Sequence, residues 1–210
     1  MSISDRGKFI TFEGIDGCGK STQVKLLVEK LNGEGQKSIL VREPGGTLVS
    51  EEIRDILLHR PASDLCDRTE ALLMCGSRAQ LTYEVILPNI ESGLNVVADR
   101  YADSTLAYQG GGRKLDLDWL IQLNTFATFG LEPDVSFFVD VLPTEAERRR
   151  KNKKDRIERA GLELQSAVRN AYLSLVRRFP ERIVVLDGHQ SVEAIHAAVQ
   201  EELKRRKLFK

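Results

Sequence analysis

The chain has few prolines, few cysteines and no net charge, and each of these shortages excludes a class of protein. Only six of its 210 residues are proline and 41% are hydrophobic, values that argue against a disordered chain. Its 31 basic and 31 acidic residues cancel, so no overall field attracts nucleic acid or an anionic membrane. We therefore predict neither as a partner, and any anion site must be local.

The cysteines also exclude two kinds of scaffold. Cys18, Cys66 and Cys75 are odd in number and lack the CxxC spacing of zinc sites, so they indicate a reducing compartment. No apolar run approaches the roughly 20 residues of a membrane span. Residues 1–6 are too polar for a signal peptide. Together these absences predict a cytoplasmic protein.

The apolar segments alternate between short runs and longer stretches of helical period, a pattern typical of a parallel sheet covered by helices. The short runs predict strands at residues 9–12, 38–41, 94–98, 135–139 and 183–186. The longer stretches predict helices at residues 20–31, 49–58, 69–91, 119–129, 162–178 and 192–204. Pro88 should bend or restart the third helix. With no repeat or linker, residues 1–210 are predicted to form one α/β domain.

The stretch FEGIDGCGKST, residues 12–22, contains a phosphate-binding motif. It completes G-x-x-x-x-G-K-[ST] between a predicted strand and a predicted helix, which is the context that the motif requires. Glycines let the backbone N–H groups face phosphate oxygens, the lysine reaches the outer phosphates, and the serine can hold Mg²⁺. The loop residues are Gly14, Ile15, Asp16, Gly17, Cys18, Gly19, Lys20, Ser21 and Thr22.

A carboxylate inside this loop is unusual. Asp16 would cost electrostatic energy beside bound phosphates unless it faced a metal, a cation or a hydroxyl, so we expect it to point at the acceptor. Charge also appears abruptly at the end of the third predicted strand, where ligands bind in such sheets. There Asp99 could bind Mg²⁺ directly or through water, and Arg100 could bridge the donor and acceptor phosphates.

The same stretch continues as DRYADSTLAYQGGGR, residues 99–113. If it starts a helix, Ser104 and Tyr108 share one face, as do Thr105 and Gln109. Gln109 carries both a donor and an acceptor, which suits a nucleobase edge. Two further clusters are REPGGT, residues 42–47, and LLMCGSRAQ, residues 72–80, in which Met74 and Arg78 are again four residues apart.

Together these stretches resemble the thymidylate kinase family, and the resemblance runs from about residue 8 to the last predicted helix. It implies a P-loop three-layer α/β/α sandwich with a five-stranded parallel sheet and a helical lid. It also implies an ATP-dependent enzyme that phosphorylates dTMP to dTDP with Mg²⁺ in dTTP biosynthesis. The implied partners are dTMP, ATP and a second copy of the chain in a homodimer.

The resemblance also assigns roles around the acceptor. It implies that Arg54 and Arg100 hold the acceptor phosphate and that Arg78 and Gln109 address the thymine. Met74 stands where the family usually has a phenylalanine that stacks on the thymine ring. The remaining positions that it assigns are Ser104 and Thr105 on the base side, Tyr108 near the sugar, and Asp16 and Glu43 on the acceptor or magnesium side.

The charged run ERRRKNKKDR, residues 147–156, is on composition alone a solvated helix face. In the resemblance it matches the lid that closes over ATP, at about residues 143–160. Family members with glycine at the position of Gly17 supply catalytic arginines from this lid. DRIE at residues 155–158 resembles the family's D-R-x-E, so Arg156 is the first choice and Arg149 the second. The implied catalytic set is then Lys20, Arg100, Asp16, Arg156 and Arg149.

Three other functions compete with this prediction. NKKD, residues 152–155, matches the guanine-reading motif of GTPases but follows charged residues instead of a buried strand, so we reject it. A deoxynucleoside kinase would need Asp16 or Glu43 as a base and would leave Arg54 nothing to bind. An ATP-binding regulatory module would leave the AYQG segment unexplained.

Overall fold

The computed structural model describes residues 6–61, 64–149 and 161–209. In this part of the chain a five-stranded parallel sheet has the order β2-β3-β1-β4-β5. The strands are β1 (Phe9–Glu13), β2 (Ser38–Arg42), β3 (Asn95–Asp99), β4 (Val135–Asp140) and β5 (Ile183–Asp187). β1 is central, because Ile10 lies opposite Val97 on one side and Val135 on the other. The predicted fold class is confirmed.

Each strand ends one residue later than the sequence predicts, and the added residue is always charged. These terminal residues are Glu13, Arg42, Asp99, Asp140 and Asp187. The apolar runs mark only the part of each strand that is buried on both faces. Since all five strands are parallel, their charged ends meet at one edge of the sheet, which is where ligands bind in open α/β folds.

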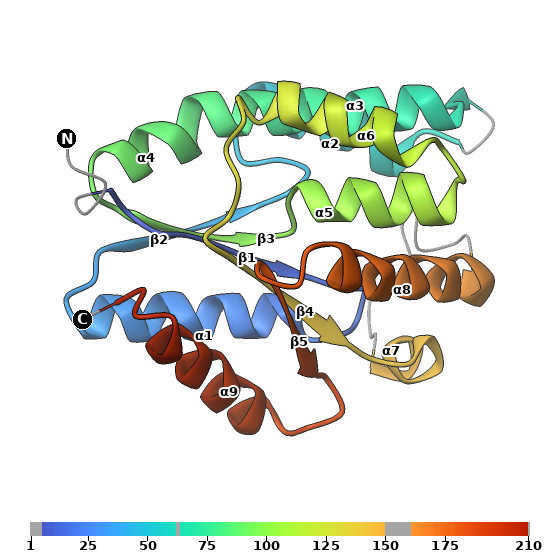
Figure 1. Ribbon diagram of the computed structural model, residues 1–210. Coiled ribbons are helices and arrows are strands. Elements are labelled where there is room, and N and C mark those ends of the chain that lie inside the picture. Colours follow the sequence, from blue (N-terminus) through green and yellow to red (C-terminus); the bar gives the residue numbers. More distant parts are fainter. Residues whose placement is uncertain (1–5, 62–63, 150–160, 210) are drawn as a thin grey trace.

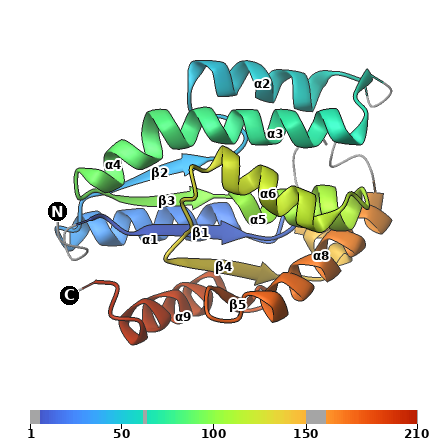
Figure 2. The same ribbon diagram turned by 45° about the horizontal axis from the view of Figure 1, so that its top comes forward.

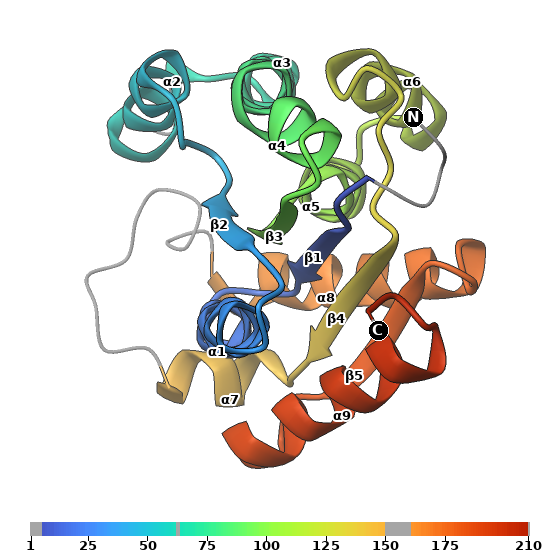
Figure 3. The ribbon, with the colours of Figure 1, turned by 90° about the vertical axis from the view of Figure 1, so that its left-hand side faces the viewer.

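Helices cover both faces of the sheet (Figure 1). The end-on view separates α1 and α9 on one side from α2 to α6 on the other (Figure 3). The first pair is α1 (Lys20–Gly33) and α9 (Val192–Arg205). The opposite layer contains α2 (Leu48–His59), α3 (Asp67–Leu81), α4 (Leu87–Glu91), α5 (Ala102–Thr105) and α6 (Leu117–Ala127). The remaining helices are α7 (Pro143–Arg149) and α8 (Gly161–Arg178).

Two π-helical segments interrupt the helical layer. The helix predicted at residues 69–91 consists of α3, η2 (Thr82–Ile86) and α4. Pro88 lies in the first turn of α4, directly after η2, so the predicted restart is confirmed. The second segment, η3 (Leu106–Gly112), continues α5.

Glycines in η3 allow α8 to approach closely. A Cβ on Gly111 would lie 2.3 Å from the Cβ of Ala171, and one on Gly112 would lie 2.7 Å from Leu164. A larger residue at position 111 would have to move α8, and one at position 112 would have to move the Leu164 side chain. Figure 2 shows α8 running beside the helix formed by α5 and η3, at the end of the sheet where the charged strand ends lie. This packing brings Tyr172 of α8 to the core beside the site.

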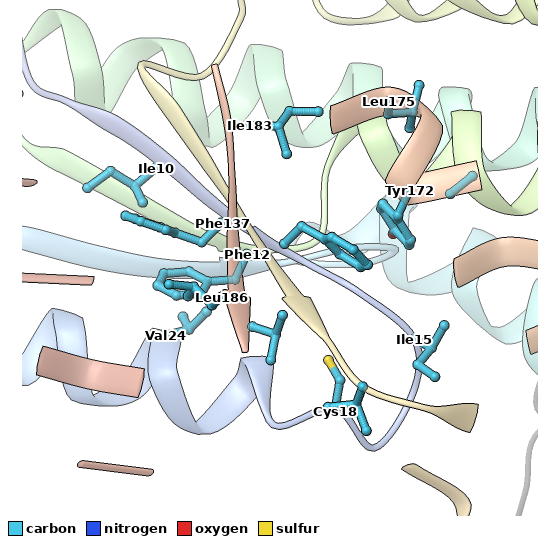
Figure 4. Packing of buried hydrophobic residues seen from close by; sticks show 14 of the residues in the cluster. Ile10, Phe12, Ile15, Cys18, Val24, Phe137, Tyr172, Leu175, Ile183 and Leu186 are labelled. Atoms are coloured by element: carbon cyan, nitrogen blue, oxygen red, sulfur yellow. The ribbon is translucent and has the colours of Figure 1, made fainter. Parts of the chain in front are cut away.

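The main core joins the sheet to α1, α8 and α9 and also includes buried residues of α3, η3 and α6. The rings of Phe12 and Phe137 lie 5.2 Å apart at its centre. Figure 4 shows Ile15 and Cys18 of the phosphate loop among these core side chains, and both are buried. The loop is therefore anchored from beneath. In the described part of the chain, no helix has the length and hydropathy needed to cross a membrane.

Candidate active site

A pocket of about 270 Å³ opens at the charged edge of the sheet. The structure brings every residue predicted to bind the acceptor to its wall: Asp16, Glu43, Arg54, Met74, Arg78, Arg100, Ser104, Thr105, Tyr108 and Gln109. Lys20, Ser21 and Asp99 line it as well. Residues that lie far apart in the sequence thus share one cavity, although their individual roles stay predictions.

The phosphate loop has the backbone that its glycines predict. Gly14, Gly17 and Gly19 have φ angles of 141°, 87° and 101°. A Cβ on Gly14 would lie 2.8 Å from both the Cys18 sulfur and the Val139 carbonyl oxygen. Burial raises the pKa of the Cys18 thiol, and the nearby Lys20 only partly opposes it. The Cys18 side chain therefore packs beneath the loop, and bound phosphates would contact the main chain of the loop.

Asp16 faces two cations and a hydroxyl. Its carboxylate lies 2.6 Å from Arg100 and 3.7 Å from the Lys20 Nζ, and it accepts a 3.0 Å hydrogen bond from the Tyr108 hydroxyl. Burial alone would raise the pKa of Asp16, but Arg100 and Lys20 outweigh it and hold the pKa well below its usual range. The carboxylate stays ionised, which meets the condition that its place in the loop requires.

Arg100 occupies a backbone conformation that is uncommon for residues other than glycine, with φ at 76°. Its guanidinium donates to Asp16, to the Ser104 hydroxyl at 3.1 Å and to the Tyr108 hydroxyl at 3.0 Å. The following peptide is held as well, because the Tyr101 N–H donates to Glu13 at 2.7 Å. Arg100 is therefore fixed at both its backbone and its side chain.

Glu13, which lies in the FEGIDGCGKST stretch but had no role predicted, supports this arrangement from below. Its fully buried carboxyl accepts hydrogen bonds from the hydroxyls of Ser104, at 2.6 Å, and Tyr172, at 2.9 Å. Burial and the neighbouring Asp103 carboxylate raise the pKa of Glu13 to about 7, although these bonds and Arg100 act in the opposite direction. The group therefore titrates near neutral pH while it links β1, α5 and α8.

Arg78 is almost wholly buried, and its donors are engaged by protein. It lies 2.6 Å from the Glu43 carboxylate and donates to Asn124, at 2.6 Å, to Thr105, at 2.8 Å, and to the Tyr101 carbonyl, at 2.9 Å. The second carboxyl oxygen of Glu43 is buried and has no hydrogen-bond partner among the described residues. Arg78 therefore organises this wall, and Glu43 keeps an acceptor available there.

A second group of cations lies near the end of β2. The Pro44 carbonyl accepts hydrogen bonds from Arg54, at 2.8 Å, and from Arg42, at 2.9 Å. The pocket is also lined by three residues with no predicted role, Arg42, Pro44 and Leu58. Arg42 and Pro44 flank Glu43 in REPGGT, so that motif was the available signal. Leu58 had none beyond its helical period.

Ser21 and Asp99 provide the oxygens predicted to hold magnesium. The Ser21 hydroxyl donates to the Asp99 carboxylate. Hydroxyl and carboxylate oxygens are hard ligands that suit Mg²⁺, so the pair fits the ion. No cluster of three or more metal-binding side chains of the His, Cys, Asp and Glu types occurs in residues 6–61, 64–149 and 161–209. Magnesium that is held largely by phosphates and waters needs no such cluster.

Of the two arginines predicted to act from the lid, the structure describes only Arg149. Arg156 and the NKKD sequence lie outside the described residues. Arg149, at the end of α7, donates to Glu145 and to the Gly188 carbonyl, both at 2.8 Å, and does not line the pocket. The structure thus places Arg149 against the loop after β5.

Comparisons with known proteins agree with this site. A family model described as thymidylate kinase matches residues 12–199. The chain is 50% identical over 208 residues to the thymidylate kinase of Caldanaerobacter subterraneus subsp. tengcongensis, with 97% of this chain and 100% of that protein covered. It is 47% identical over 192 residues to that of Fervidobacterium nodosum, with 91% and 95% covered. A crystal structure of the thymidylate kinase from Ehrlichia chaffeensis superposes with a TM-score of 0.75 and 32% identity, with 94% of this chain and 99% of that chain covered. The matched residues include the whole pocket.

Proposed function

The chain belongs to the thymidylate kinase family and is an ATP-dependent kinase that phosphorylates dTMP to dTDP in dTTP biosynthesis, and we propose how its pocket divides that work. The observation that carries the proposal is the uneven lining of the pocket. Lys20, Asp16 and Arg100 lie at the phosphate loop, whereas Met74 and Gln109 lie on helical segments of the opposite wall. A nucleotide is divided in the same way, with charged phosphate at one end and a base at the other.

The donor would bind at the loop. Main-chain N–H groups of residues 14–22 would hold the ATP phosphates at the N-terminus of α1. Lys20 would reach the outer phosphates. Ser21 and Asp99 would hold Mg²⁺, directly or through water, and the bound ion supplies charge that offsets the negative charge of the phosphates.

The acceptor would lie across the pocket with its phosphate toward the cations. Arg54 and Arg100 would hold the dTMP phosphate, and Tyr108 and Asp16 would lie beside the sugar. Met74, Ser104, Thr105 and Gln109 would surround the thymine. Arg78 would address the thymine together with Gln109, and its bonds to Glu43 and Thr105 would hold it in this base-binding wall.

This arrangement suits phosphoryl transfer between two phosphates. The transition state is loose and spreads charge over the moving group, so positioned cations matter more than covalent catalysis. The second pKa of a phosphate monoester is about 6, so the acceptor is a competent nucleophile at neutral pH. No general base is needed. Lys20 and Arg100 would stabilise the transferred group, while Asp16 would keep Arg100 oriented.

Residues of the lid would complete the site around ATP. We propose that residues 143–160 form this lid and that Arg156, or failing that Arg149, contributes the further catalytic charge. The bond from Arg149 to the Gly188 carbonyl supports a position of α7 next to the loop after β5. We propose further that residues 1–210 form one domain and that the protein acts in the cytoplasm, which its three free cysteines support.

A homodimer is also proposed, and exposed apolar side chains support it. Leu72, Tyr83 and Phe126 are 52%, 66% and 84% exposed on α3, η2 and α6, and Phe129, just after α6, is 57% exposed. The rings of Tyr83 and Phe129 lie 6.0 Å apart, so they belong to one patch. Figure 3 shows α3 and α6 near the outside of the helical layer. Large contiguous patches of exposed apolar side chains mark protein–protein contact sites.

The test is a coupled assay for ADP release with ATP plus dTMP, thymidine or neither, each with and without Mg²⁺. Turnover is expected only with dTMP and Mg²⁺. Turnover with thymidine would mark a deoxynucleoside kinase, and none in any mixture would mark a binding module. Arg100→Ala should lower kcat by about 10³-fold, whereas the exposed Arg177→Ala should not. Retention of most activity in a folded Arg100→Ala protein would contradict the role of Arg100.

A further inference from the structure

Behind Gln109 lies a charged pair that the proposed reaction does not use. Glu70 of α3 is 2% exposed and forms a two-point ion pair with Arg113, with its two carboxyl oxygens 3.2 Å from the Nε and Nη2 atoms. The Gln109 side-chain amide donates from Nε2 to the same carboxylate at 2.9 Å. Gln109 itself lines the pocket. The pair therefore touches a pocket residue from the protein side.

We propose that Glu70 and Arg113 are positioning residues that fix the Gln109 amide with its oxygen toward the pocket, so that the site selects a pyrimidine with an N–H at N3. This inference rests on the proposed function, which puts the base at this wall. It goes further by naming what sets the choice among pyrimidines. Thymine and uracil carry that N–H, whereas cytosine carries a lone pair there.

The orientation follows from the chemistry of the three groups. A side-chain amide can turn by 180° and exchange its donor and acceptor ends. A carboxylate paired with a guanidinium only accepts hydrogen bonds, so the amide must turn its NH₂ group toward Glu70. Turning Gln109 over would bring two acceptor oxygens within about 3 Å in a buried place. The Gln109 amide oxygen is therefore left as the acceptor that the base meets.

Arg113 makes this orientation specific. Its planar guanidinium holds both oxygens of Glu70, which prevents the carboxyl group from rotating away from Gln109. Arg113 follows η3, the segment that carries Gln109, and the Leu115 N–H returns to the Gln109 carbonyl at 3.0 Å. The same turn therefore positions both the amide and the cation behind it.

The decisive variant is Glu70→Gln, which keeps the shape of the side chain but can donate as well as accept. The Gln109 amide can then present either end to the base. We expect the preference for dTMP over dCMP, as a ratio of kcat/KM values, to fall by about 10-fold or more. The preference for dTMP over dUMP should stay the same, since both bases carry the N3–H and differ only in a methyl group.

A matched control lies one turn away on α3. Asp67 is half exposed and its carboxylate lies 3.6 Å from Arg113, but no bond connects it to Gln109. Asp67→Asn removes the same charge from the same arginine, so both preferences should remain at their wild-type values. Arg113→Lys keeps the positive charge but cannot hydrogen-bond both oxygens of Glu70 at once. It should lower only the preference for dTMP over dCMP, and by less than Glu70→Gln does. If Glu70→Gln does not fold, Arg113→Lys carries the test.

The outcomes separate this inference from the function on which it rests. If the wild-type protein does not phosphorylate dTMP, the proposed function fails. If it does, and a folded Glu70→Gln protein loses activity equally on dTMP, dUMP and dCMP or changes on none, only the role of the pair is overturned. Wild-type turnover of N3-methyl-dTMP as fast as of dTMP would overturn it too, because no N–H would then be read.

Discussion

At the scale of single residues, Met74 and Leu58 supply the apolar part of the pocket wall. Met74 is half-buried on α3 and also packs against the main core. A thioether is polarizable and contacts an aromatic face favourably, but three rotatable bonds leave its position loosely defined. The chain thus offers the base a flexible surface on one side, while Gln109 on the other side is held by its bond to Glu70.

Met74→Phe should give equal or better kcat/KM for dTMP and a sharper preference for thymine over uracil and cytosine. A rigid ring stacks on the base with about 0.5–1.5 kcal/mol beyond simple burial and holds the base plane in one orientation. Steady-state kinetics with dTMP, dUMP and dCMP would measure this. Met74→Leu, which conserves volume without adding a ring, is the control and should not sharpen the preference. A large loss of dTMP turnover in Met74→Phe would mean that the base binds elsewhere.

At the scale of secondary-structure elements, Glu13 joins three parts of the fold at one carboxyl group. It ends β1, accepts from the Tyr101 N–H and Ser104 hydroxyl at α5, and accepts from the Tyr172 hydroxyl of α8. Asp103, the neighbour that raises its pKa, is itself paired with Arg182 at 2.6 Å. The elements around Arg100 are therefore held together by a group whose charge changes near neutral pH.

The pKa of Glu13 gives a prediction for stability. Because the folded value, about 7, exceeds the ordinary 4.5, the folded chain holds the proton more tightly. The tighter binding of this proton stabilises the fold fully below pH 4.5, and the stabilisation is lost as pH rises through 7. Glu13→Gln lacks the titration, so its free energy of unfolding relative to wild type should rise between pH 4.5 and 7, by at most about 3 kcal/mol. Urea unfolding at pH 4.5, 5.5, 7 and 8 would measure it.

The control residue for this experiment is Glu202, whose pKa is lowered instead of raised. Hydrogen bonds from Arg205 and Arg206 lower the pKa of Glu202 to about 2. The contribution of Glu202 to the stability of the fold is present at pH values above its ordinary pKa, and it is lost only as pH falls toward 2. The difference between Glu202→Gln and wild type should therefore stay constant from pH 5.5 to 8. A constant difference for Glu13→Gln over pH 4.5 to 8 would show that its carboxyl group does not titrate there.

At the scale of the whole molecule, the two faces of the sheet are covered differently. α1 and α9 pack over one face, and the other carries the layer whose outer helices expose Leu72, Tyr83, Phe126 and Phe129 (Figure 3). The pocket lies at the carboxyl edge of the sheet, and this patch lies on the helical layer beside it. A second copy of the chain bound to this patch would therefore contact α3 and stabilise it. This helix carries Met74, Arg78 and Glu70.

Phe126→Glu should convert the proposed homodimer into a monomer, because a charge at the most exposed apolar residue of α6 would be desolvated in the interface. Sedimentation velocity at micromolar concentration would measure the mass. Val192→Glu, at an exposed apolar residue of α9 outside the patch, should leave the dimer intact. A monomeric wild-type protein, or a Phe126→Glu protein that remains a dimer, would show that the patch is not the interface.

Local pattern determined much of this protein. Buried strands need continuous apolar runs, and a phosphate loop needs glycines at fixed spacing, so neighbouring residues alone predicted the five strands and the loop. The charged residue that ends each strand is also local information, although the apolar runs stopped one residue short of it. The motifs after β2 and β3 and on α3 and η3 predicted the residues that the fold brings into one pocket.

Only the tertiary structure decided which groups support those residues. Glu13 and Tyr172 are 159 residues apart in the sequence, Arg78 and Asn124 are 46 apart, and Gln109 and Glu70 are 39 apart. No periodicity relates such pairs, because they meet only when α3, α6, η3 and α8 pack at the edge of the sheet. A local pattern records which face of an element is buried. What that face meets depends on packing, and packing determines the pKa of Glu13, the bonds of Arg78 and the orientation of Gln109.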